Sequence, residues 1–590
     1  MSFDIPEKDN KKITYRMNYK WNYQPPTEQE TLRAEALSKE TGINPIVCRL
    51  LIDRGVTTAE ESKRFFRPSL TDLHDPFLMD GMDAAVERIN QALGRKERIL
   101  VYGDYDVDGT TAVSLVYRFL QQFTTNIDYY IPNRYNDGYG VSYKGVDYAK
   151  DTGVKLVIVL DCGVKAVDEI AYAKELGIDF IVCDHHVQDE VLPPAVAILN
   201  PKLIGSHYPY PHLSGCGVGF KLMQAFAKDN GIEFSQLIPY LDLVAVSIAS
   251  DIVPIMGENR ILAYHGLRQL NHNPSTGLQA IIEVCGLRNK EIKINDIIFK
   301  IGPRINASGR IQTGKEAVDL LTEKDYTKAL ELSNQINEYN EARKDLDKSM
   351  TEEANRIVDN LEGLADKRSI VLYNEDWHRG VIGIVASRLT ELFYRPSVVL
   401  TKTNDMATGS ARSVADFDVY KAIESCRDLL DNFGGHPYAA GLTLKVDNIE
   451  EFTRRFEEYV SENIQPTQTD AIIYIDEELS FKEINMKLYN HLKRFEPFGP
   501  DNLKPIFCSM QVYDYGTSKV VGHNQEHIKL ELVDNRSNRI MNGIAFGQSA
   551  QARYIKSKQA FDICYTIEES THKRGEIQLQ IESIKPRALG

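Results

Sequence analysis

The sequence predicts an α/β protein in which a parallel sheet is followed by a long helix, a second and smaller α/β unit, and a β-barrel. Short apolar runs alternate with helical stretches from residue 85 to 260, which is typical of a parallel sheet with helices on both faces. Residues 322–360 contain no Pro or Gly and are mostly polar, which predicts one long solvated helix. Beyond residue 465, short β-rich runs separated by turn residues are typical of a small antiparallel barrel or sandwich.

Length and composition are those of a globular protein with several domains. The chain has 590 residues, too many for one core, and about three or four domains are expected. No apolar run approaches the ~20 residues that span a bilayer, and the N-terminus lacks the apolar region of a signal peptide, so we expect a cytoplasmic protein. The net charge of -15 argues weakly against nucleic acid, which metal ions or local Arg and Lys clusters would have to attract.

Five regions are predicted along the chain. Residues 1–84 form a helical N-terminal extension, in which Thr27 and Glu30 have the spacing of a capping box. Residues 85–318 form the first α/β domain, 319–364 the connecting helix, 365–464 the second α/β domain and 465–590 the β-barrel. The strands of the first domain are expected at 98–102, 127–131, 155–160, 179–183 and 195–199. Those of the barrel include 471–475, 527–532 and 577–581.

Metal-binding residue types follow four apolar runs of the first α/β domain. They are Asp104, Asp106 and Asp108, then Asp161, then Asp184, His185 and His186, and finally Asp251. The carboxyl ends of parallel strands meet at one edge of a sheet, so we expect these four clusters to converge on one sheet edge. Unpaired carboxylates at the ends of buried strands would be costly, which favours a shared site for divalent cations over solvated turns.

The ligand types indicate the metal and the reaction. Two ions roughly 3.5–4 Å apart can activate a water and stabilise the leaving oxygen of a phosphoryl displacement. Because no set of thiolates is present, Mn²⁺ or Mg²⁺ is favoured over zinc. The eight cysteines are scattered and expected to be reduced, and Cys162 and Cys183 are expected to be apolar fillers at strand ends. The sequence therefore predicts a two-metal phosphohydrolase or phosphodiesterase.

These motifs resemble those of the DHH phosphoesterase superfamily. The resemblance rests on the Asp-x-Asp-x-x-Gly run before a helix, the strand-borne Asp161, the Asp-His-His triplet and the later Asp251. The second α/β unit carries Gly-Ser-Ala-Arg-Ser at 409–413 and Gly-Gly-His at 434–436, and it resembles the companion DHHA1 domain. The segments 302–310, 377–389 and 496–499 look like the RecJ family of single-strand-specific 5′→3′ DNA exonucleases.

The resemblance implies a role for each residue of the acidic clusters. Five positions match the superfamily's metal ligands: Asp106, Asp108, Asp161, His185 and Asp251. Among them, Asp161 would bridge the two ions, and whether Asp104 is a further ligand stays open. His186 would face the scissile phosphate as an electrostatic stabiliser or proton donor, and Asp184 would orient the two histidines.

The resemblance to the RecJ family also implies a pocket for the 5′-terminal phosphate. Arg134 of the first domain would bind this phosphate together with Ser410 and Arg412 of the second. The planar guanidinium of Arg fits phosphate oxygens, and Ser adds a hydroxyl. A pocket at fixed reach from the metals would explain both the exonuclease polarity and small products. Further DNA contacts are expected from Arg304, Arg310 and His436, with a surface salt bridge as the alternative for each arginine.

The β-rich tail resembles an OB-fold, which grips single strands by stacking and charge. Candidate contacts are Tyr513, Tyr515, Lys519, His523 and Lys529, with core packing as the alternative for the aromatics. The predicted substrate is single-stranded DNA, digested from its 5′ end to mononucleotides in recombination and repair. A single-strand-binding protein and a RecQ-type helicase are partners that the family role implies, and no membrane partner is expected.

Two alternatives stay open. A DHH–DHHA1 phosphodiesterase acting on cyclic dinucleotides or short oligonucleotides would share the metal site, but it is not expected to carry the 377–389 segment with a β-rich tail. A non-catalytic replication scaffold would have lost ligands, and every expected acidic and histidine position is filled here. The exonuclease is therefore the favoured function.

Overall fold

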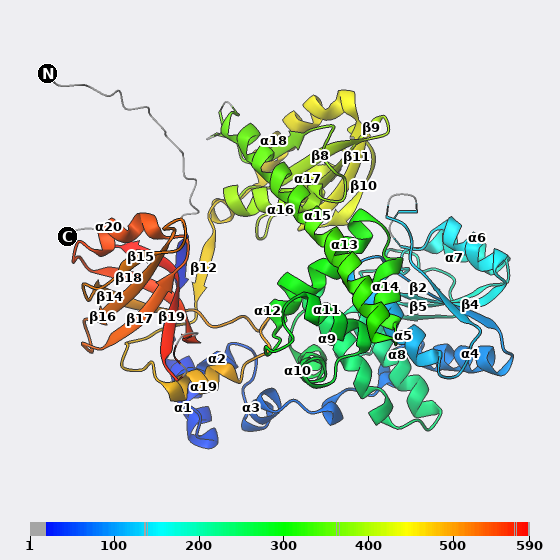
Figure 1. Ribbon diagram of the computed structural model, residues 1–590, viewed down its shortest axis with the longest axis horizontal. Coiled ribbons are helices and arrows are strands. Elements are labelled where there is room, and N and C mark those ends of the chain that lie inside the picture. Colours follow the sequence, from blue (N-terminus) through cyan, green and yellow to red (C-terminus); the bar gives the residue numbers. More distant parts are fainter. Residues whose placement is uncertain are drawn as a thin grey trace. The chain divides into compact units, whose positions relative to one another are not determined.

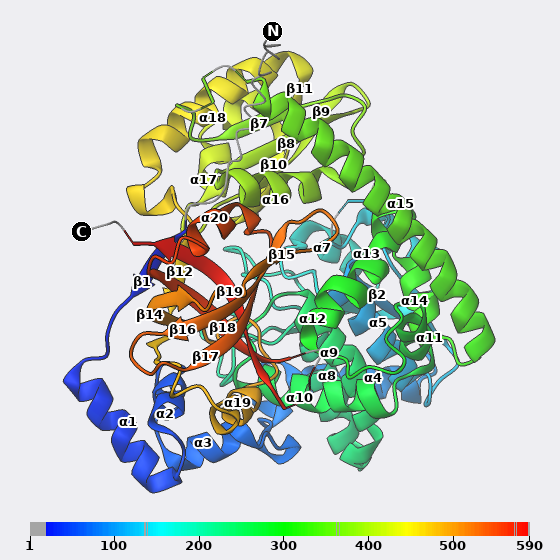
Figure 2. The same ribbon diagram turned by 60° about the vertical axis from the view of Figure 1, so that its left-hand side comes forward.

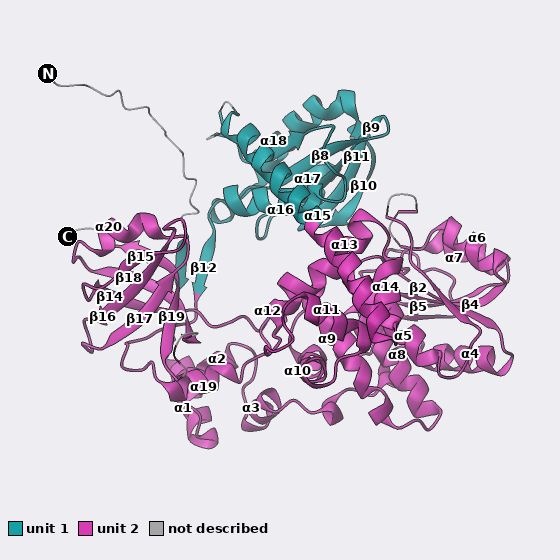
Figure 3. Ribbon diagram, in the orientation of Figure 1, with its two compact units in different colours: residues 1–23, 342–474 teal, residues 24–341, 475–590 magenta. Residues whose placement is uncertain are grey.

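The computed structural model describes residues 19–587 except 135, 136, 139, 362, 365, 571, 572 and 574. The chain forms two compact units, which Figure 3 colours separately. One unit contains residues 24–341 and 475–590, and the other contains residues 342–474 with the N-terminal residues through Tyr23. Among the described helices, none has the length and apolar character needed to cross a membrane.

The first α/β domain is built on a five-stranded, fully parallel sheet, as predicted (Figure 1). Its strands lie in the order β3-β2-β4-β5-β6. In chain order, their bounds are Arg98–Gly103 (β2), Ile127–Tyr130 (β3), Val154–Leu160 (β4), Asp179–Cys183 (β5) and Ala197–Leu199 (β6). Because all strands run the same way, their carboxyl ends share one edge of the sheet.

Alternate residues of each strand are buried on opposite faces of this sheet. In β4, Leu156 and Ile158 belong to one apolar cluster, whereas Val157 and Val159 belong to another. This two-sided burial explains the continuous apolar runs in the sequence. The first cluster is completed by α4 (Met82–Gly94), α5 (Val107–Leu120) and α8 (Gly215–Asp229). The second is completed by α6 (Tyr143–Asp151) and α7 (Val167–Glu175).

A helical layer follows the sheet. Its helices are α9 (Leu241–Ser250), α10 (Gly257–His272), α11 (Thr276–Val284), α12 (Ile294–Asp296), a π-helical turn (Ile297–Ile301), α13 (Gly302–Ile311) and α14 (Lys315–Thr322). The apolar run before Asp251 is therefore a helix, whereas we expected all four clusters to follow strands of one sheet. The run is uniformly apolar and of intermediate length, so its pattern does not separate a buried strand from a buried helix.

The long connecting helix is α15 (Tyr326–Asp359), which has 34 residues. Its first half contributes Ala329 and Ile336 to the core of the first α/β domain. Its second half contributes Met350, Ala354 and Val358 to the core of the other unit, where they pack with Trp377 and its neighbours. One uninterrupted helix thus belongs to two cores.

The second α/β unit has a mixed five-stranded sheet in the order β10-β11-β9-β8-β7, in which only β7 and β8 are parallel. The strands are β7 (Ile370–Tyr373), β8 (Ser397–Thr403), β9 (Met406–Arg412), β10 (Leu430–His436) and β11 (Ala439–Lys445). The helices are α16 (Ile382–Phe393), α17 (Val419–Glu424) and α18 (Ile449–Asn463). A small separate sheet pairs β1 (Lys20–Tyr23) with β12 (Ile472–Ile475), so the run at 471–475 forms a strand but not one of the barrel, where we expected it.

The β-rich tail is a closed five-stranded barrel, drawn in orange and red in Figure 2. The order is β14-β18-β19-β17-β16, and antiparallel pairing of β16 with β14 closes it. The strands are β14 (Phe507–Asp514), β16 (His527–Asp534), β17 (Ile540–Ala545), β18 (Phe561–Glu569) and β19 (Ile577–Pro586). Smaller elements are α19 (Met486–Lys493), α20 (Ala552–Ile555), β13 (Glu477–Glu478) and β15 (Lys519–Val521). This closed topology confirms the predicted OB-like barrel.

The N-terminal extension is largely helical where it is described, and residues 1–18 lie outside the described part. It contains α1 (Glu28–Thr41), which begins with the predicted capping box, α2 (Pro45–Ile52) and α3 (Ala59–Phe66). The ring of Phe66 lies 5.4 Å from that of Phe495, and both residues belong to the apolar core of the barrel. The extension therefore completes the core of the barrel, a role that the sequence pattern did not reveal.

Single 3₁₀ turns lie at Leu70–Asp72, Pro76–Leu78, Phe234–Gln236, Ile238–Tyr240, Arg427–Leu429, Val446–Asn448, Pro466–Gln468 and Ser549–Gln551.

Candidate metal centre

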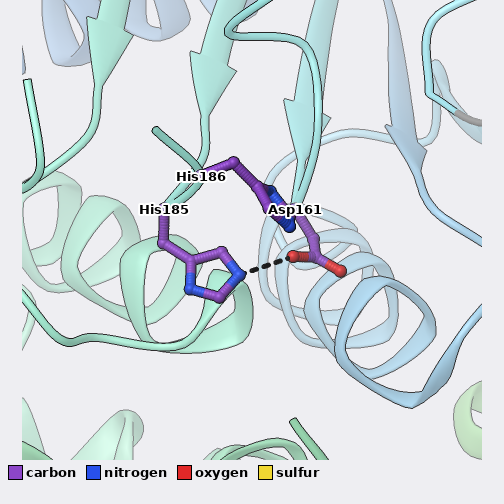
Figure 4. Close-up of side chains that lie close together, drawn as sticks. All are labelled: Asp161, His185 and His186. Carbon is purple, nitrogen blue, oxygen red and sulfur yellow. Dashed lines mark ion pairs between the residues drawn. The ribbon is translucent and has the colours of Figure 1, made fainter. Parts of the chain in front are cut away.

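The four predicted acidic clusters meet at the carboxyl edge of the parallel sheet. His185 lies at their centre, and its Nε2 is 3.1 Å from Asp161 Oδ1 (Figure 4). The same nitrogen is 3.6 Å from Asp251 Oδ2 and 3.8 Å from Asp108 Oδ2. Side chains from the ends of two strands and of one helix, and from the first turn of another, therefore form one constellation.

Three groups of side chains in this constellation place their ligand atoms within 4.8 Å of one another. They are Asp161 with His185 and His186, Asp108 with His185 and Asp251, and Asp104 with Asp106 and Asp161. Asp161 and His185 each belong to two of the groups. Such sharing is the arrangement that two neighbouring ions with a bridging carboxylate require.

Asp106 and Asp108 are placed by the start of α5. Asp106 is the N-cap residue, and its Oδ1 accepts from Gly109 N at 3.0 Å. Asp108 lies in the first turn, where its carboxylate accepts from Gly215 N at 2.6 Å and Cys216 N at 2.7 Å. Asp106 and Asp108 stand at alternate positions and would share one side of an extended segment, but the helix already begins at Val107. The N-cap turn brings Asp106 to the site, and the first residues of α8 fix Asp108.

Asp161 has a left-handed backbone, with φ 61°. Its N donates to Cys183 O at 2.8 Å, so the residue is held at the very end of the β4–β5 ladder. A Cβ atom on Gly215 would lie 2.6 Å from Asp161 Oδ1, so only glycine allows α8 to approach this closely. An unusual backbone conformation at a candidate ligand is typical of functional sites.

Asp184 lies behind the two histidines. Its carboxylate accepts from the backbone of Val164 at 2.9 Å, of His185 at 2.7 Å and of His186 at 3.1 Å, and from His186 Nδ1 at 2.7 Å. The hydrogen bond from His186, the charge of its ring and the bonds from the backbone lower the pKa of Asp184 in spite of its burial. The ionised carboxylate therefore makes Nδ1 of His186 a donor and sets the orientation of its ring.

The electrostatics of the cluster favour a bound cation. Burial, and then the charges of neighbouring carboxylates, raise the pKa values of Asp104, Asp106, Asp161 and Asp251. Burial also lowers the pKa of His185 to about 4, which keeps the ring neutral and able to bind a metal. Among the described residues, neither Asp104 Oδ1 nor His185 Nδ1 has a hydrogen-bond partner, although both are buried. The residues present therefore fit divalent cations with oxygen and nitrogen ligands.

Helix α13 packs against two segments that carry candidate ligands, the loop before α5 and the end of α9. A Cβ atom on Gly309 would lie 2.6 Å from Tyr105 O, and one on Gly302 would lie 2.8 Å from Ser250 Oγ. Tyr105 and Ser250 adjoin Asp104, Asp106 and Asp251 in sequence. The glycines of the 302–310 motif thus allow close packing next to the metal centre. The sequence shows these glycines, but this packing role was not predicted from it.

Lys202 is a further residue that sequence reasoning missed. Burial lowers the pKa of its ammonium, and the nearby charges of Asp251 and Asp184 oppose this shift. Its backbone N donates to Asn200 Oδ1 at 2.8 Å, and Asn200 Nδ2 donates to His186 O at 2.8 Å. The signal available in the sequence was the Asn-Pro-Lys run that follows β6.

Three predicted DNA-binding arginines lie in the same unit as the metal centre. The guanidinium of Arg134 lies over the ring of Tyr105, with Cζ 4.9 Å from the centroid. Arg304 donates from Nε to Asn337 Oδ1 at 2.9 Å and from Nη1 to Lys300 O at 2.8 Å, so part of its guanidinium serves helix packing. Arg310 is in the last turn of α13.

The other predicted phosphate-binding residues lie in the second α/β unit. Ser410 and Arg412 are alternate residues of β9, and Arg412 Nη1 donates to Ser410 Oγ at 2.8 Å. A Cβ atom on Gly383, in the first turn of α16, would lie 3.0 Å from both Ser410 Oγ and Arg412 Nη2. Ser410 and Arg412 therefore lie next to the N-terminus of α16, and the backbone amides of a helix N-terminus favour anions. His436 is exposed at the end of β10.

Fold and site together define a metal-dependent phosphoesterase of the DHH class. Family models match the DHH family N-terminal domain at residues 98–248, the DHHA1 domain at 366–462 and the RecJ OB domain at 475–583. With these three domains in this order and the relatives described next, the chain belongs to the RecJ family of single-stranded-DNA-specific exonucleases.

Two curated relatives and one solved structure illustrate the similarity. The single-stranded-DNA-specific exonuclease RecJ of Bacillus subtilis is 36% identical over 88% of this chain, which spans 65% of that relative. The RecJ of Haemophilus influenzae is 32% identical over 92% of this chain and 96% of its own length. The crystal structure of RecJ in complex with Mn²⁺ from Thermus thermophilus has a TM-score of 0.82 at 25% identity, covering 97% of this chain and 80% of that one.

Proposed function

We propose that this protein hydrolyses single-stranded DNA from its 5′ end to mononucleotides, with two Mn²⁺ or Mg²⁺ ions at the carboxyl edge of the parallel sheet. The observation that carries the proposal is the sharing of Asp161 and His185 between overlapping groups of ligand atoms. Family membership supports the substrate, because the curated relatives are single-stranded-DNA-specific exonucleases. Two bound ions would activate a water and stabilise the leaving oxygen. The proposed ligands are Asp104, Asp106, Asp108, Asp161, His185 and Asp251.

Two further residues of the site act without binding a metal: Asp184 orients His186, and His186 acts on the phosphate. Asp184 accepts from His186 Nδ1 at 2.7 Å and holds the imidazole ring in one orientation. In this orientation His186 acts on the scissile phosphate as an electrostatic stabiliser or proton donor. Asp104 is included among the ligands because its buried Oδ1 has no hydrogen-bond partner among the described residues. A cation would satisfy this oxygen.

The polarity of digestion is set by a pocket for the terminal phosphate. Arg412 and Ser410 lie beside the first turn of α16, which adds backbone amides to a guanidinium and a hydroxyl. Arg134 contributes a further guanidinium, and Arg304, Arg310 and His436 contact the DNA backbone. A terminal-phosphate pocket at fixed reach from the metals would explain both the 5′ polarity and the small product.

The OB-like barrel favours this substrate over a cyclic dinucleotide. A small diffusible substrate does not need a barrel of the kind that binds single strands. In recombination and repair, a helicase of the RecQ type would supply single strands and a single-strand-binding protein would deliver them. Both partners are implied by the family role alone.

End-labelled substrates test the proposal. In Mn²⁺, we expect mononucleotides from the 5′ end of a single strand, while a blunt duplex and a cyclic dinucleotide are spared. Asp161→Ala should abolish turnover and Mn²⁺ binding while single-strand binding persists. Turnover of the cyclic dinucleotide alone, or release from the 3′ end, would contradict the proposed function.

A further inference from the structure

Ile252, the residue after the proposed ligand Asp251, has a backbone conformation that isoleucine rarely adopts. Its φ is 59°, in the left-handed region. Helix α9 ends at Ser250 with Asp251 as its C-cap, so Ile252 occupies the position at which glycine or asparagine usually ends a helix. Of the eleven non-glycine residues with positive φ in the described part of the chain, Ile252 alone is β-branched. A β-branched residue is strained there.

The side chain does not offset this strain by burial. Ile252 is 69% exposed, whereas Val253 and Ile255, which follow it, are buried in the core. Exposed isoleucines are common, but one that is strained and also adjoins a candidate metal ligand is not explained by folding alone. An exposed apolar side chain at this position is suited to contact a ligand bound at the metal centre.

The surrounding chain holds Ile252 firmly in place. Upstream, the N of Asp251 donates to Ser247 O at 2.9 Å and continues the helical bonding. Downstream, Pro254 O accepts from Asn259 Nδ2 at 3.0 Å and from Tyr210 OH at 3.2 Å. The exposed side chain is therefore presented from a fixed backbone, and a ligand would bind to it without ordering a loop.

We propose that Ile252 is a specificity-determining residue that packs against the nucleobases flanking the scissile phosphate. This inference rests on the proposed function, because it requires a DNA strand at the metal centre. A phosphodiester bound near Asp251 places its two nucleosides within reach of the next residue. Isoleucine is one of the apolar side chains with which proteins separate stacked bases, and a single strand yields to such a wedge more readily than a duplex.

A substrate that lacks bases isolates this contact. We expect Ile252→Gly to lower kcat/KM on a normal 5′-phosphorylated single strand by about fivefold to tenfold, the lower end of the loss for one stacking contact. On a strand whose first two nucleotides are abasic, Ile252→Gly and the parent protein should be equally active. Ile252→Asn, which tolerates positive φ but is polar, should behave like the glycine variant. Ile252→Leu should keep most of the activity.

Two further measurements separate this role from its alternatives. Mn²⁺ affinity, measured by calorimetry, should be the same in Ile252→Gly and the parent protein, and the Tm of the variant should not fall. An equal loss on normal and abasic strands, or a weakened Mn²⁺ affinity, would overturn the inference and make Ile252 a positioning residue for Asp251. Failure of the parent protein to digest the normal strand would instead overturn the proposed function, and the inference with it.

Discussion

Arg260 donates a hydrogen bond from Nη1 to the carbonyl oxygen of Phe495 at 2.8 Å. Its guanidinium also donates to the carbonyls of Phe65, Arg494, Glu496 and Pro497, and Cζ lies 3.9 Å from the centroid of the Phe65 ring. Burial lowers the pKa of Arg260 to about 9, and the group stays charged at neutral pH. Arg260 of α10 thus joins α3 and the 496–499 segment to the first α/β domain. The 496–499 segment therefore has a structural function at this junction between the first domain and the barrel.

The first prediction concerns this junction. Arg260→Met keeps much of the side-chain volume but leaves five carbonyl oxygens without their donor, so the free energy of unfolding should fall by about 3 kcal/mol. Urea denaturation measures this change. Arg64→Met is the control, because Arg64 and its partner Glu60 are both largely exposed and a change below about 0.5 kcal/mol is expected. Equal effects of the two substitutions would refute this account of the junction.

The second prediction concerns charge repulsion at the metal centre. Burial and the charges of Asp108 and Asp106 raise the pKa of Asp161, so its ionised form destabilises the metal-free protein at neutral pH. Asp161→Asn should therefore raise the Tm measured in chelator. In Mn²⁺ the Tm of the parent protein should rise, since the ions bind only the folded state, and that of the variant should rise much less. A variant with a lower Tm in chelator would contradict this electrostatic account.

The third prediction concerns the close packing of α13. A Cβ atom on Gly309 would lie 2.6 Å from the backbone oxygen of Tyr105, so Gly309→Ala must displace the loop between Asp104 and Asp106. We expect at least a tenfold loss of Mn²⁺ affinity, measured by calorimetry, because metal ligation depends on sub-ångström placement. Gly94→Ala is the matched control, since no atom lies within 4 Å of the added methyl group, and its affinity should be unchanged.

The fourth prediction concerns the terminal phosphate. The parent protein should digest a 5′-phosphorylated strand faster than a 5′-hydroxyl strand, and Arg412→Ala should reduce this preference at least tenfold by removing a bidentate donor. Steady-state rates on the two strands give the comparison. Arg455→Ala serves as a control in the same unit, because Arg455 is bound to Asp428 at 2.7 Å, and the preference should survive. Loss of rate on both strands alike would assign Arg412 to folding.

The sequence allowed the parallel sheet to be predicted almost strand by strand, because burial on both faces leaves continuous apolar runs with few alternative interpretations. The strands at 98–102 and 179–183 are examples. The site was predictable for the same reason, since Asp161 and the Asp184–His186 triplet directly follow such runs. Asp251 does lie beside His185, as expected, but it follows a helix and not a strand, because an apolar run of that length fits a buried helix equally well.

Features that depend on contacts between distant segments could not be predicted. The packing of Phe66 against Phe495 joins residues far apart in the chain, and no local pattern specifies it. The same holds for the close approach of Gly309 to Tyr105. Glycine alone does not indicate which backbone approaches it, so the motif was visible while its physical purpose was not.

The connecting helix α15 restricts the number of residues that can be inserted between its two buried stripes. Ala329 and Ile336 are buried in one core, and Met350 and Ala354 in another, along a single helix without Pro or Gly. Each residue advances an α-helix by about 100°, so one inserted residue would turn the second buried stripe by that angle relative to the first. An insertion of seven residues would restore the phase to within about 20°. Natural insertions and deletions in this segment are therefore expected to span whole helical turns.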